Sequence, residues 1–178
     1  MDRFHNNEMP EQGDVSPEHL SLEHDFEKRF AEPESLELPG GTGEVIDISP
    51  EKAKDETPIF LAPGWGCDLD VYKGTLKTLF EQERRVVSLN HPRHGGDLKA
   101  HSTEEMLEKY PTEELRKALN ILSVMEQKGI PQADVIAHSE GAINTTIAAT
   151  LHPEKFRNIV FFGPAGLQDS SGKIRSAA

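Results

Sequence analysis

The sequence is poor in cysteine and in aromatic side chains: it holds one cysteine, and Phe, Trp and Tyr make up 6% of its 178 residues. One cysteine excludes an internal disulfide bond and a zinc site built from several cysteines. No apolar run approaches the ~20 residues that cross a membrane, and residues 1–10 lack the apolar core of a signal peptide. We therefore expect a soluble, cytoplasmic protein that does not have a membrane as a partner.

Basic side chains are also scarce, and the acidic excess lies at one end of the chain. The formal net charge is −12, and residues 1–58 hold 16 acidic and 5 basic side chains. Residues 59–178 hold 15 acidic and 14 basic side chains, so this part is nearly neutral. Because this composition does not favour a basic surface, we expect no nucleic acid among the partners.

The acidic end predicts an extension over residues 1–32. Its polar composition buries little surface, so its first fifteen residues are expected to be disordered. A helix is predicted after Ser16-Pro17, with Leu22, Phe26 and Phe30 along one face. That face either docks on the following domain, which is the simpler interpretation, or binds a partner.

Residues 33–167 are predicted to form one domain, followed by a tail without pattern over residues 168–178. Short apolar runs alternate with segments of helical periodicity. Strands are expected at residues 36–38, 44–48, 58–62, 85–89 and 158–162, and just before Ser139. Because strand, helix and strand in succession form parallel crossover units, the predicted fold class is α/β, a doubly wound, mostly parallel sheet with flanking helices.

The predicted helices begin and end at recognisable signals. The first can be capped by Asp68 or Asp70. Its buried face is expected to hold Val71, Tyr72, Leu76, Leu79 and Phe80. A second helical region starts with a capping-box pattern at residues 102–105, and Pro111 interrupts it. A third helix is expected over residues 143–151.

The glycine-rich spacer at residues 39–43 has the composition of a phosphate-binding loop. No Gly-Lys-Ser/Thr follows it, and no helix begins there. A hairpin turn between two strands is therefore the better interpretation.

The most informative stretch is DVIAHSEGA at residues 134–142, which predicts a strand, a tight turn and a helix. Ser139 stands at the apex, where its hydroxyl would project from the sheet. The backbone N–H of Glu140 opens the helix, so the positive end of the helix dipole faces the same point. Small residues are needed two positions before and after the serine, and Ala137 and Gly141 stand there. Such a position suits a nucleophile.

This pattern resembles the nucleophile elbow of the α/β-hydrolase superfamily, with Ala137 in place of the usual first glycine. The resemblance covers residues 35–167, and two further stretches carry it. Pro63-Gly64-Trp65-Gly66 is similar to the loop after the family's third strand, although a proline replaces the common histidine. Residues 90–95 resemble the family's Asp-x-Pro-Gly-x-Gly loop and keep only its proline and final glycine.

The resemblance implies a serine hydrolase that acts on an ester or thioester carbonyl of a small molecule. Ser139 would be the nucleophile, and the backbone N–H groups of Trp65 and Glu140 would bind the oxyanion. It implies no cofactor and no metal. The Gly-Trp-Gly loop is most similar to small carboxylesterases, a likeness too short to identify the substrate.

Several neighbouring residues have alternative interpretations. Trp65 could simply fill space beneath a loop. Cys67 could be a second nucleophile, but a small buried thiol at a helix start is the simpler view. His91, His94 and Asp97 could bind a metal, although a Pro- and Gly-rich loop does not fix how they face one another.

The sequence lacks a complete catalytic triad. In the resembled family the acid and the histidine follow the serine, yet no histidine occurs after His152, which lies a whole helix beyond Ser139. His138 cannot easily turn back to take the serine's proton and is interpreted as a packing residue. Asp169 stands where some members carry the acid.

We therefore expect this chain to be the front half of a longer hydrolase, either truncated or completed by another chain. The apolar strand at residues 158–162 supports this, because such a strand needs cover on both faces and both edges. Two other hypotheses remain open: a hydrolase-like binding module without catalysis, and an acyltransferase or perhydrolase on the same fold. The oligomeric state is not predicted.

Overall fold

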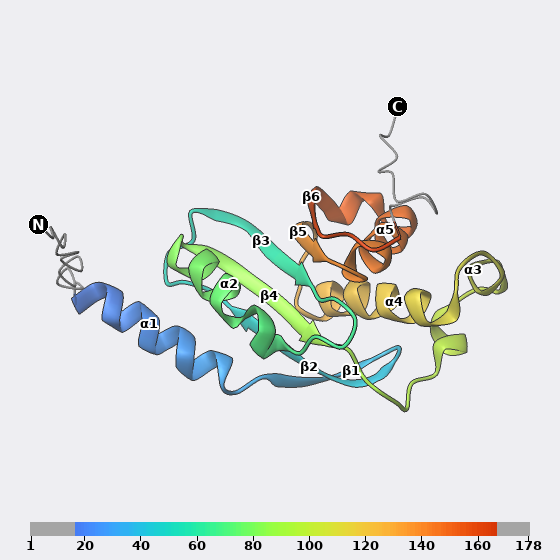
Figure 1. Cartoon of the computed structure of the whole chain (residues 1–178), viewed down its shortest axis with the longest axis horizontal. Helices are drawn as coiled ribbons and strands as arrows, with labels where there is room; N and C mark the ends of the chain where they lie inside the picture. The colour runs from blue at the N-terminus through green and yellow to red at the C-terminus, as the bar shows by residue number, and fades with distance from the viewer. Residues whose placement is uncertain (1–16, 167–178) are drawn as a thin grey trace, which may run out of the picture.

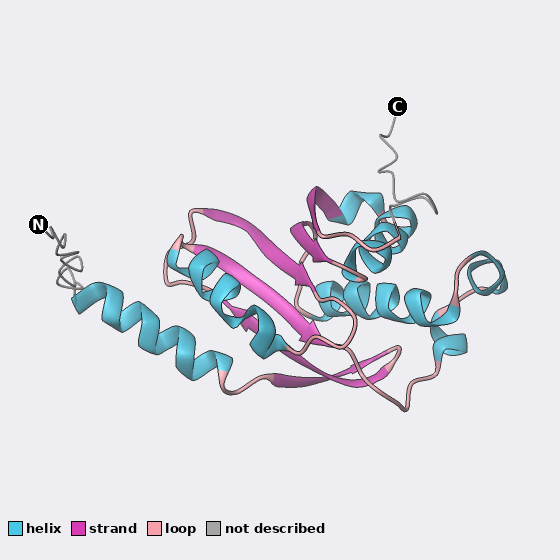
Figure 2. Cartoon of the chain, in the orientation of Figure 1, coloured by secondary structure: helices cyan, strands magenta, loops and turns pink. Residues whose placement is uncertain are grey.

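The computed structural model describes residues 17–166, with side chains from residue 21 onward (Figure 1). The predictions for the first fifteen residues, Ser16, Asp169 and the tail at 168–178 fall outside the described residues. Figure 2 shows strands gathered into a sheet with helices packed around it.

The sheet is mixed and has the strand order β1-β2-β4-β3-β5-β6. The last four of these positions, β4, β3, β5 and β6, are mutually parallel, whereas β2 runs antiparallel to both β1 and β4. The bounds are β1 Glu34–Leu38, β2 Gly41–Ile48, β3 Asp55–Ala62, β4 Arg84–Asn90, β5 Ala133–His138 and β6 Phe156–Phe162. The predicted α/β class with a mostly parallel sheet is confirmed.

Helices cover both faces of the sheet. Their bounds are α1 Pro17–Phe30, α2 Leu69–Glu81, α3 Glu104–Lys109, α4 Thr112–Gln127 and α5 Gly141–Leu151, with short 3₁₀ turns at Leu98–His101 and Pro153–Lys155. Leu61 of β3 packs with the α1 and α2 side, whereas its neighbours Phe60 and Ala62 pack with the α4 side. Covering both faces explains why β3 is a continuous apolar run. No helix within residues 17–166 is long and apolar enough to cross a membrane.

Helix α1 docks on α2 through its apolar face. Phe26 and Phe30 are buried, and the ring centroid of Phe26 lies 5.6 Å from the ring centroid of Phe80 in α2. Ion pairs between glutamates of α1 and lysines of α2 flank this contact. The structure therefore shows the simpler of the two roles that the sequence left open for this helix.

The hairpin between β1 and β2 is tighter than predicted. Leu38 pairs with Gly41, so the turn is only Pro39-Gly40, and the remaining glycines belong to β2. Gly41 has a φ of 113°, and an added Cβ would lie 2.3 Å from the backbone oxygen of His94. The glycine therefore permits a close approach between β2 and the loop after β4, not a longer turn.

One prediction about a helix face is wrong, and the predicted helix starts are found. Val71 is 65% exposed, because the buried stripe of α2 follows Leu69, Tyr72, Leu76 and Phe80. The capping-box pattern at residues 102–105 does start helix α3: Thr103 is the N-cap, and its hydroxyl accepts the N–H of Met106. Asp68 does occupy the N-cap position of α2, but its side chain makes no capping hydrogen bond.

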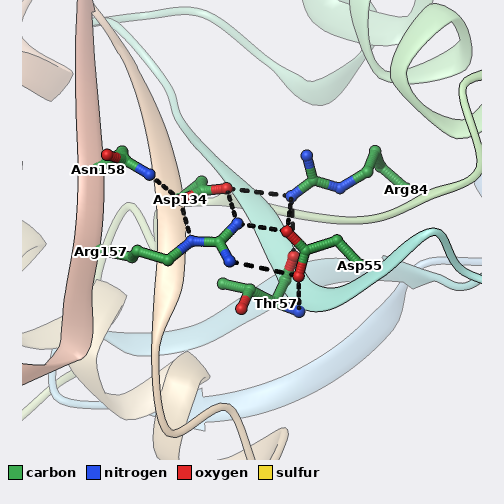
Figure 3. Close-up of polar contacts among 6 residues, drawn as sticks. All are labelled: Asp55, Thr57, Arg84, Asp134, Arg157 and Asn158. Atoms are coloured by element: carbon green, nitrogen blue, oxygen red, sulfur yellow. Dashed lines mark hydrogen bonds and ion pairs between the residues drawn. The ribbon is translucent and has the colours of Figure 1, made fainter.

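An ion-pair network joins the amino-terminal ends of the four parallel strands (Figure 3). The guanidinium of Arg157, in β6, lies 2.5 Å from the carboxylate of Asp134 in β5 and 2.6 Å from that of Asp55 in β3. Arg84 of β4 lies 3.0 Å from Asp134. Each parallel strand contributes one charged residue, so the network links the amino-terminal ends of all four strands.

The network lowers the pKa of both carboxyl groups. Hydrogen bonds from Arg157 and from the Thr57 N–H bring the pKa of Asp55 to about 2. The same guanidinium is the main reason that the pKa of Asp134 is lowered well below its ordinary value. Because both carboxyl groups bind protons less readily in the folded state, their ionisation stabilises the fold above the ordinary carboxyl pKa of ~3.9.

Acid is therefore expected to remove part of the stability. As the pH falls from about 4 toward about 2, the unfolded carboxyl groups bind protons first, so the free energy of unfolding should fall. Urea unfolding followed by circular dichroism should show a steeper fall for the wild type than for Asp134→Asn. Glu56→Gln, which changes an exposed acid outside the network, should behave as the wild type. Equal slopes for the wild type and Asp134→Asn would contradict this account.

Candidate active site

Ser139 occupies the turn between β5 and α5 in a conformation that is unusual for its residue type. Its φ is 51°, in the left-handed region that costs a non-glycine residue ~1 kcal/mol or more. Three backbone hydrogen bonds hold it there: its N–H donates to Phe162, and its carbonyl accepts from Ala142 and Ala165, all at 3.0–3.1 Å. The strain is thus maintained by β6, the loop after it and the first turn of α5.

The turn lies directly against the end of β3. A Cβ at Gly141 would stand 2.4 Å from the carbonyl oxygen of Ala62 and 2.7 Å from that of Pro63. Ala137, two residues before the serine, is fully buried. The need for a small residue after Ser139 therefore has a steric cause at Gly141, where the Cα lies close to two backbone carbonyl oxygens.

The loop after β3 also touches the serine itself. A Cβ at Gly64 would lie 2.9 Å from Nδ1 of His138 and 3.1 Å from the Cβ of Ser139. A Cβ at Gly64 would therefore require the His138 ring or the loop to shift, and glycine avoids this. The Gly-Trp-Gly loop and the serine turn, which are far apart in the sequence, therefore form one unit.

The backbone N–H groups of Trp65 and Glu140 directly follow the two residues in that contact. Within residues 17–166, neither N–H donates to a protein acceptor. The side chain of Trp65 is 77% exposed, so it does not fill space beneath the loop, as one alternative held. Two N–H groups without acceptors beside a strained serine are suited to bind a developing oxyanion.

His138 makes a contact that the sequence did not predict. Its ring does pack, 5.4 Å from the ring of Phe162, but its Nδ1 also lies 2.8 Å from the hydroxyl of Tyr72. The Tyr72 oxygen accepts the N–H of Gly64, also at 2.8 Å. Burial raises the pKa of Tyr72 to about 12, so this hydroxyl keeps its proton at neutral pH. Tyr72 was expected only as one member of an apolar helix face.

The side chain of Glu140 pairs with Lys117 of α4. The Nζ of Lys117 lies 2.6 Å from Oε2 of Glu140, and the two side chains are only 17% and 16% exposed. The Glu140 carboxylate is stabilised by the positive end of the α5 dipole, but its negative charge would repel an oxyanion bound nearby. Lys117 offsets that negative charge, and no spacing in the sequence links the two residues.

A cavity of about 930 Å³ opens beside this unit, at the carboxyl ends of β3 and β4. Its walls include the loop from Gly64 to Asp68, the segment that follows β4, and Lys117. Ser139 does not line it, but Gly64 and Lys117, which contact Ser139 and Glu140, do. Ligands of open α/β sheets bind outside the carboxyl ends of the strands, so the cavity is a candidate substrate site.

Two of the three residues considered for a metal site, Asp97 and His91, make other contacts. Asp97 accepts the N–H groups of Lys99 and Ala100 at the start of a 3₁₀ turn. His91 lies 3.3 Å from the amide nitrogen of Asn120, and burial lowers the pKa of this histidine to about 3. In the described part of the chain, no group of three His, Cys, Asp or Glu side chains could hold a metal.

No base reaches Ser139 among the described residues. His152 stands at the far end of α5, where its Nδ1 lies 3.0 Å from Glu154. Cys67, the alternative nucleophile, is a partly buried free thiol that packs against the core beneath α2. Residues 17–166 therefore bring together a candidate nucleophile and two candidate oxyanion donors without the rest of a triad.

The chain belongs to the alpha/beta hydrolase fold family, whose model matches residues 57–177. This confirms the family that the serine turn and the Gly-Trp-Gly loop resemble. The family match begins within β3 and includes every parallel strand, the Gly-Trp-Gly loop and Ser139.

Known proteins similar to this chain have varied activities. The dihydrolipoyllysine-residue acetyltransferase component of the acetoin cleaving system of Pseudomonas putida is 29% identical over 114 residues, which are 64% of this chain and 28% of that protein. A probable hydrolytic enzyme from Pseudomonas aeruginosa has a TM-score of 0.60 at 23% identity, covering 79% of this chain and 43% of that one. Epoxide hydrolase A from Mycobacterium thermoresistibile has a TM-score of 0.56 at 18% identity, covering 73% and 38%.

These comparisons have a common limit. The chain spans less than half the length of each of these three proteins. The structural similarity, at identities below 25%, shows the fold and not the reaction.

The contact at Gly141 can be tested by substitution. Gly141→Ala would force a methyl group against two carbonyl oxygens, so we expect the free energy of unfolding to fall by about 1–3 kcal/mol. Gly74→Ala is the matched control, because a Cβ on that residue of α2 meets nothing within 4 Å. It should stabilise the helix by about 0.5–1 kcal/mol. Urea unfolding measures both changes, and a Gly141→Ala variant as stable as the wild type would contradict the close approach.

The pair of Lys117 and Glu140 can be tested by a double-mutant cycle. Lys117→Met leaves a largely buried carboxylate unpaired, and we expect it to cost about 1–3 kcal/mol of unfolding free energy. Adding Glu140→Gln removes the uncompensated charge and should recover most of that loss. Thermal and urea unfolding of the two single variants and the double variant measure the coupling, and strictly additive changes would show that the pair is not coupled.

Proposed function

We propose that the protein is a serine hydrolase that acts on an ester or thioester carbonyl of a small molecule. The hydroxyl of Ser139 adds to the carbonyl carbon and gives its proton to a base, and the resulting oxyanion accepts hydrogen bonds from the N–H groups of Trp65 and Glu140. Collapse of this intermediate expels an alcohol or thiol, which takes the proton. Water then attacks the acyl-serine by the same route and releases the acid.

One observation carries the proposal: the left-handed Ser139 lies against the loop that holds Trp65, and the N–H groups of Trp65 and Glu140 have no protein acceptor within residues 17–166. Family membership supports the reaction class, and the cavity beside Gly64 and Lys117 offers room for a small molecule. The proposal assigns the base and its orienting acid to residues outside the described range. A histidine and a carboxylate are the pair that this chemistry uses.

Acyl transfer to an acceptor other than water is the second candidate. The Pseudomonas putida relative, whose name includes an acetyltransferase activity, favours it. Both reactions pass through the same acyl-serine and differ only in what attacks it. Epoxide opening fits the chain less well, because a serine would form a stable ether with the opened ring, whereas water readily cleaves an acyl ester.

Covalent labelling tests the nucleophile. A fluorophosphonate probe applied to the whole protein should modify Ser139, and Ser139→Ala should lower labelling at least a hundredfold, because the reacting oxygen is removed. Ser123→Ala, which removes a hydroxyl from α4, is the matched control and should label normally. Peptide mass spectrometry locates the adduct.

Two results would contradict the proposal: equal labelling of Ser139→Ala and the wild type, or no labelling of a folded whole protein. The second would favour a hydrolase-like binding module. Where labelling occurs, product analysis with water and an alcohol in competition separates hydrolysis from acyl transfer, since transfer yields the new ester as the main product.

A further inference from the structure

We infer that Tyr72 is a positioning residue that holds the candidate oxyanion loop and the serine turn at a fixed separation. The contacts of Tyr72 are observed in the structure, and their importance for catalysis rests on the proposed function. The hydroxyl of Tyr72 contacts Gly64, the residue before Trp65, and His138, the residue before Ser139. One oxygen atom therefore ties together the two segments that carry the candidate reacting groups.

The scaffold behind this hydroxyl is rigid. Tyr72 lies on α2 and is only 7% exposed, in the same core cluster as Leu69, Leu76 and Phe80. A ring packed in a core has little freedom, so its hydroxyl has a defined place at the edge of the sheet. The two hydrogen bonds of this hydroxyl therefore fix the positions of the Gly64 loop and the serine turn relative to α2.

The loop needs such an anchor because it has few others. Gly64 and Gly66 flank Trp65, and Gly66 has a φ of 67°. The Trp65 side chain is largely exposed and holds nothing in place. Within the described residues, the N–H of Gly64 donates to Tyr72, and the carbonyl of Gly64 accepts from Cys67 at 3.3 Å. Losing the Tyr72 hydroxyl would leave the shorter of these two hydrogen bonds unmade.

The same geometry assigns a tautomer to His138. The Tyr72 oxygen accepts the N–H of Gly64, and we assign the hydroxyl's own proton to its 2.8 Å hydrogen bond with Nδ1 of His138. Nδ1 is then an acceptor, and the ring carries its proton on Nε2. Tyr72 therefore holds the ring next to the candidate nucleophile in one orientation and one tautomer.

The test compares Tyr72→Phe with Tyr110→Phe in the whole protein. Tyr110 is the chain's other tyrosine, and its hydroxyl is buried with no partner in the described part of the chain, so its removal is the matched control. With ¹⁵N-labelled histidine, long-range ¹H–¹⁵N NMR reports the protonated nitrogen of each ring. His138→Gln assigns the His138 signal by its disappearance.

We expect the His138 ring to be the Nε2–H tautomer in the wild type and in Tyr110→Phe, and to become a mixture of tautomers in Tyr72→Phe. The maximal rate of fluorophosphonate labelling at Ser139 should fall about tenfold in Tyr72→Phe, which corresponds to one lost hydrogen bond. The probe concentration at half-maximal rate should stay unchanged, because the probe's binding site is intact.

Two outcomes would overturn the inference: an Nδ1–H ring in the wild type, or a Tyr72→Phe variant with unaltered tautomer and labelling rate. Failure of the proposed function looks different. If the whole protein is not labelled at all, the serine hydrolase assignment fails, while the tautomer change still decides whether Tyr72 ties the two segments together.

Discussion

The candidate site depends on the close approach of two segments, the serine turn after β5 and the end of β3 with the loop that follows it. The turn at Ser139 and Gly141 lies against the end of β3, and Gly64 lies against Ser139 in return. The contact at Gly141 with two backbone carbonyl oxygens is too short for a Cβ, and a Cβ at Gly64 would require the His138 ring to shift. Backbone hydrogen bonds to Phe162, Ala142 and Ala165 hold the serine's left-handed φ at this contact.

The ion-pair network and the candidate active site lie at opposite ends of the parallel strands. Arg84, Asp55, Asp134 and Arg157 fasten the amino-terminal ends through ion pairs. The carboxyl ends carry the loops and the cavity, together with glycines at positive φ, the strained Ser139, and the N–H groups of Trp65 and Glu140, which have no acceptor within residues 17–166. Fastening one edge fixes the strand register, and a fixed register allows loops at the other edge to hold strained conformations.

The periodicity of apolar residues predicted most of the fold. Strands buried on both faces and amphipathic helices each have a characteristic apolar pattern that can be recognised in the sequence. The serine turn was also predictable, because the tight turn requires small residues close to the serine in the sequence. The roles of Tyr72, His138 and Lys117 were not predictable, because each depends on a partner far away in the sequence. Val71 was misplaced because residues one position apart on a helix point about 100° apart.

The most direct measurement is a crystal structure of the whole protein after reaction with a small phosphonate ester probe, whose phosphoryl oxygen mimics the oxyanion. The account predicts a bond from phosphorus to the Ser139 oxygen, with the phosphoryl oxygen about 2.7–3.1 Å from the backbone nitrogens of Trp65 and Glu140. A phosphoryl oxygen that faces solvent or is bound by other donors, or an adduct on another residue, would contradict it.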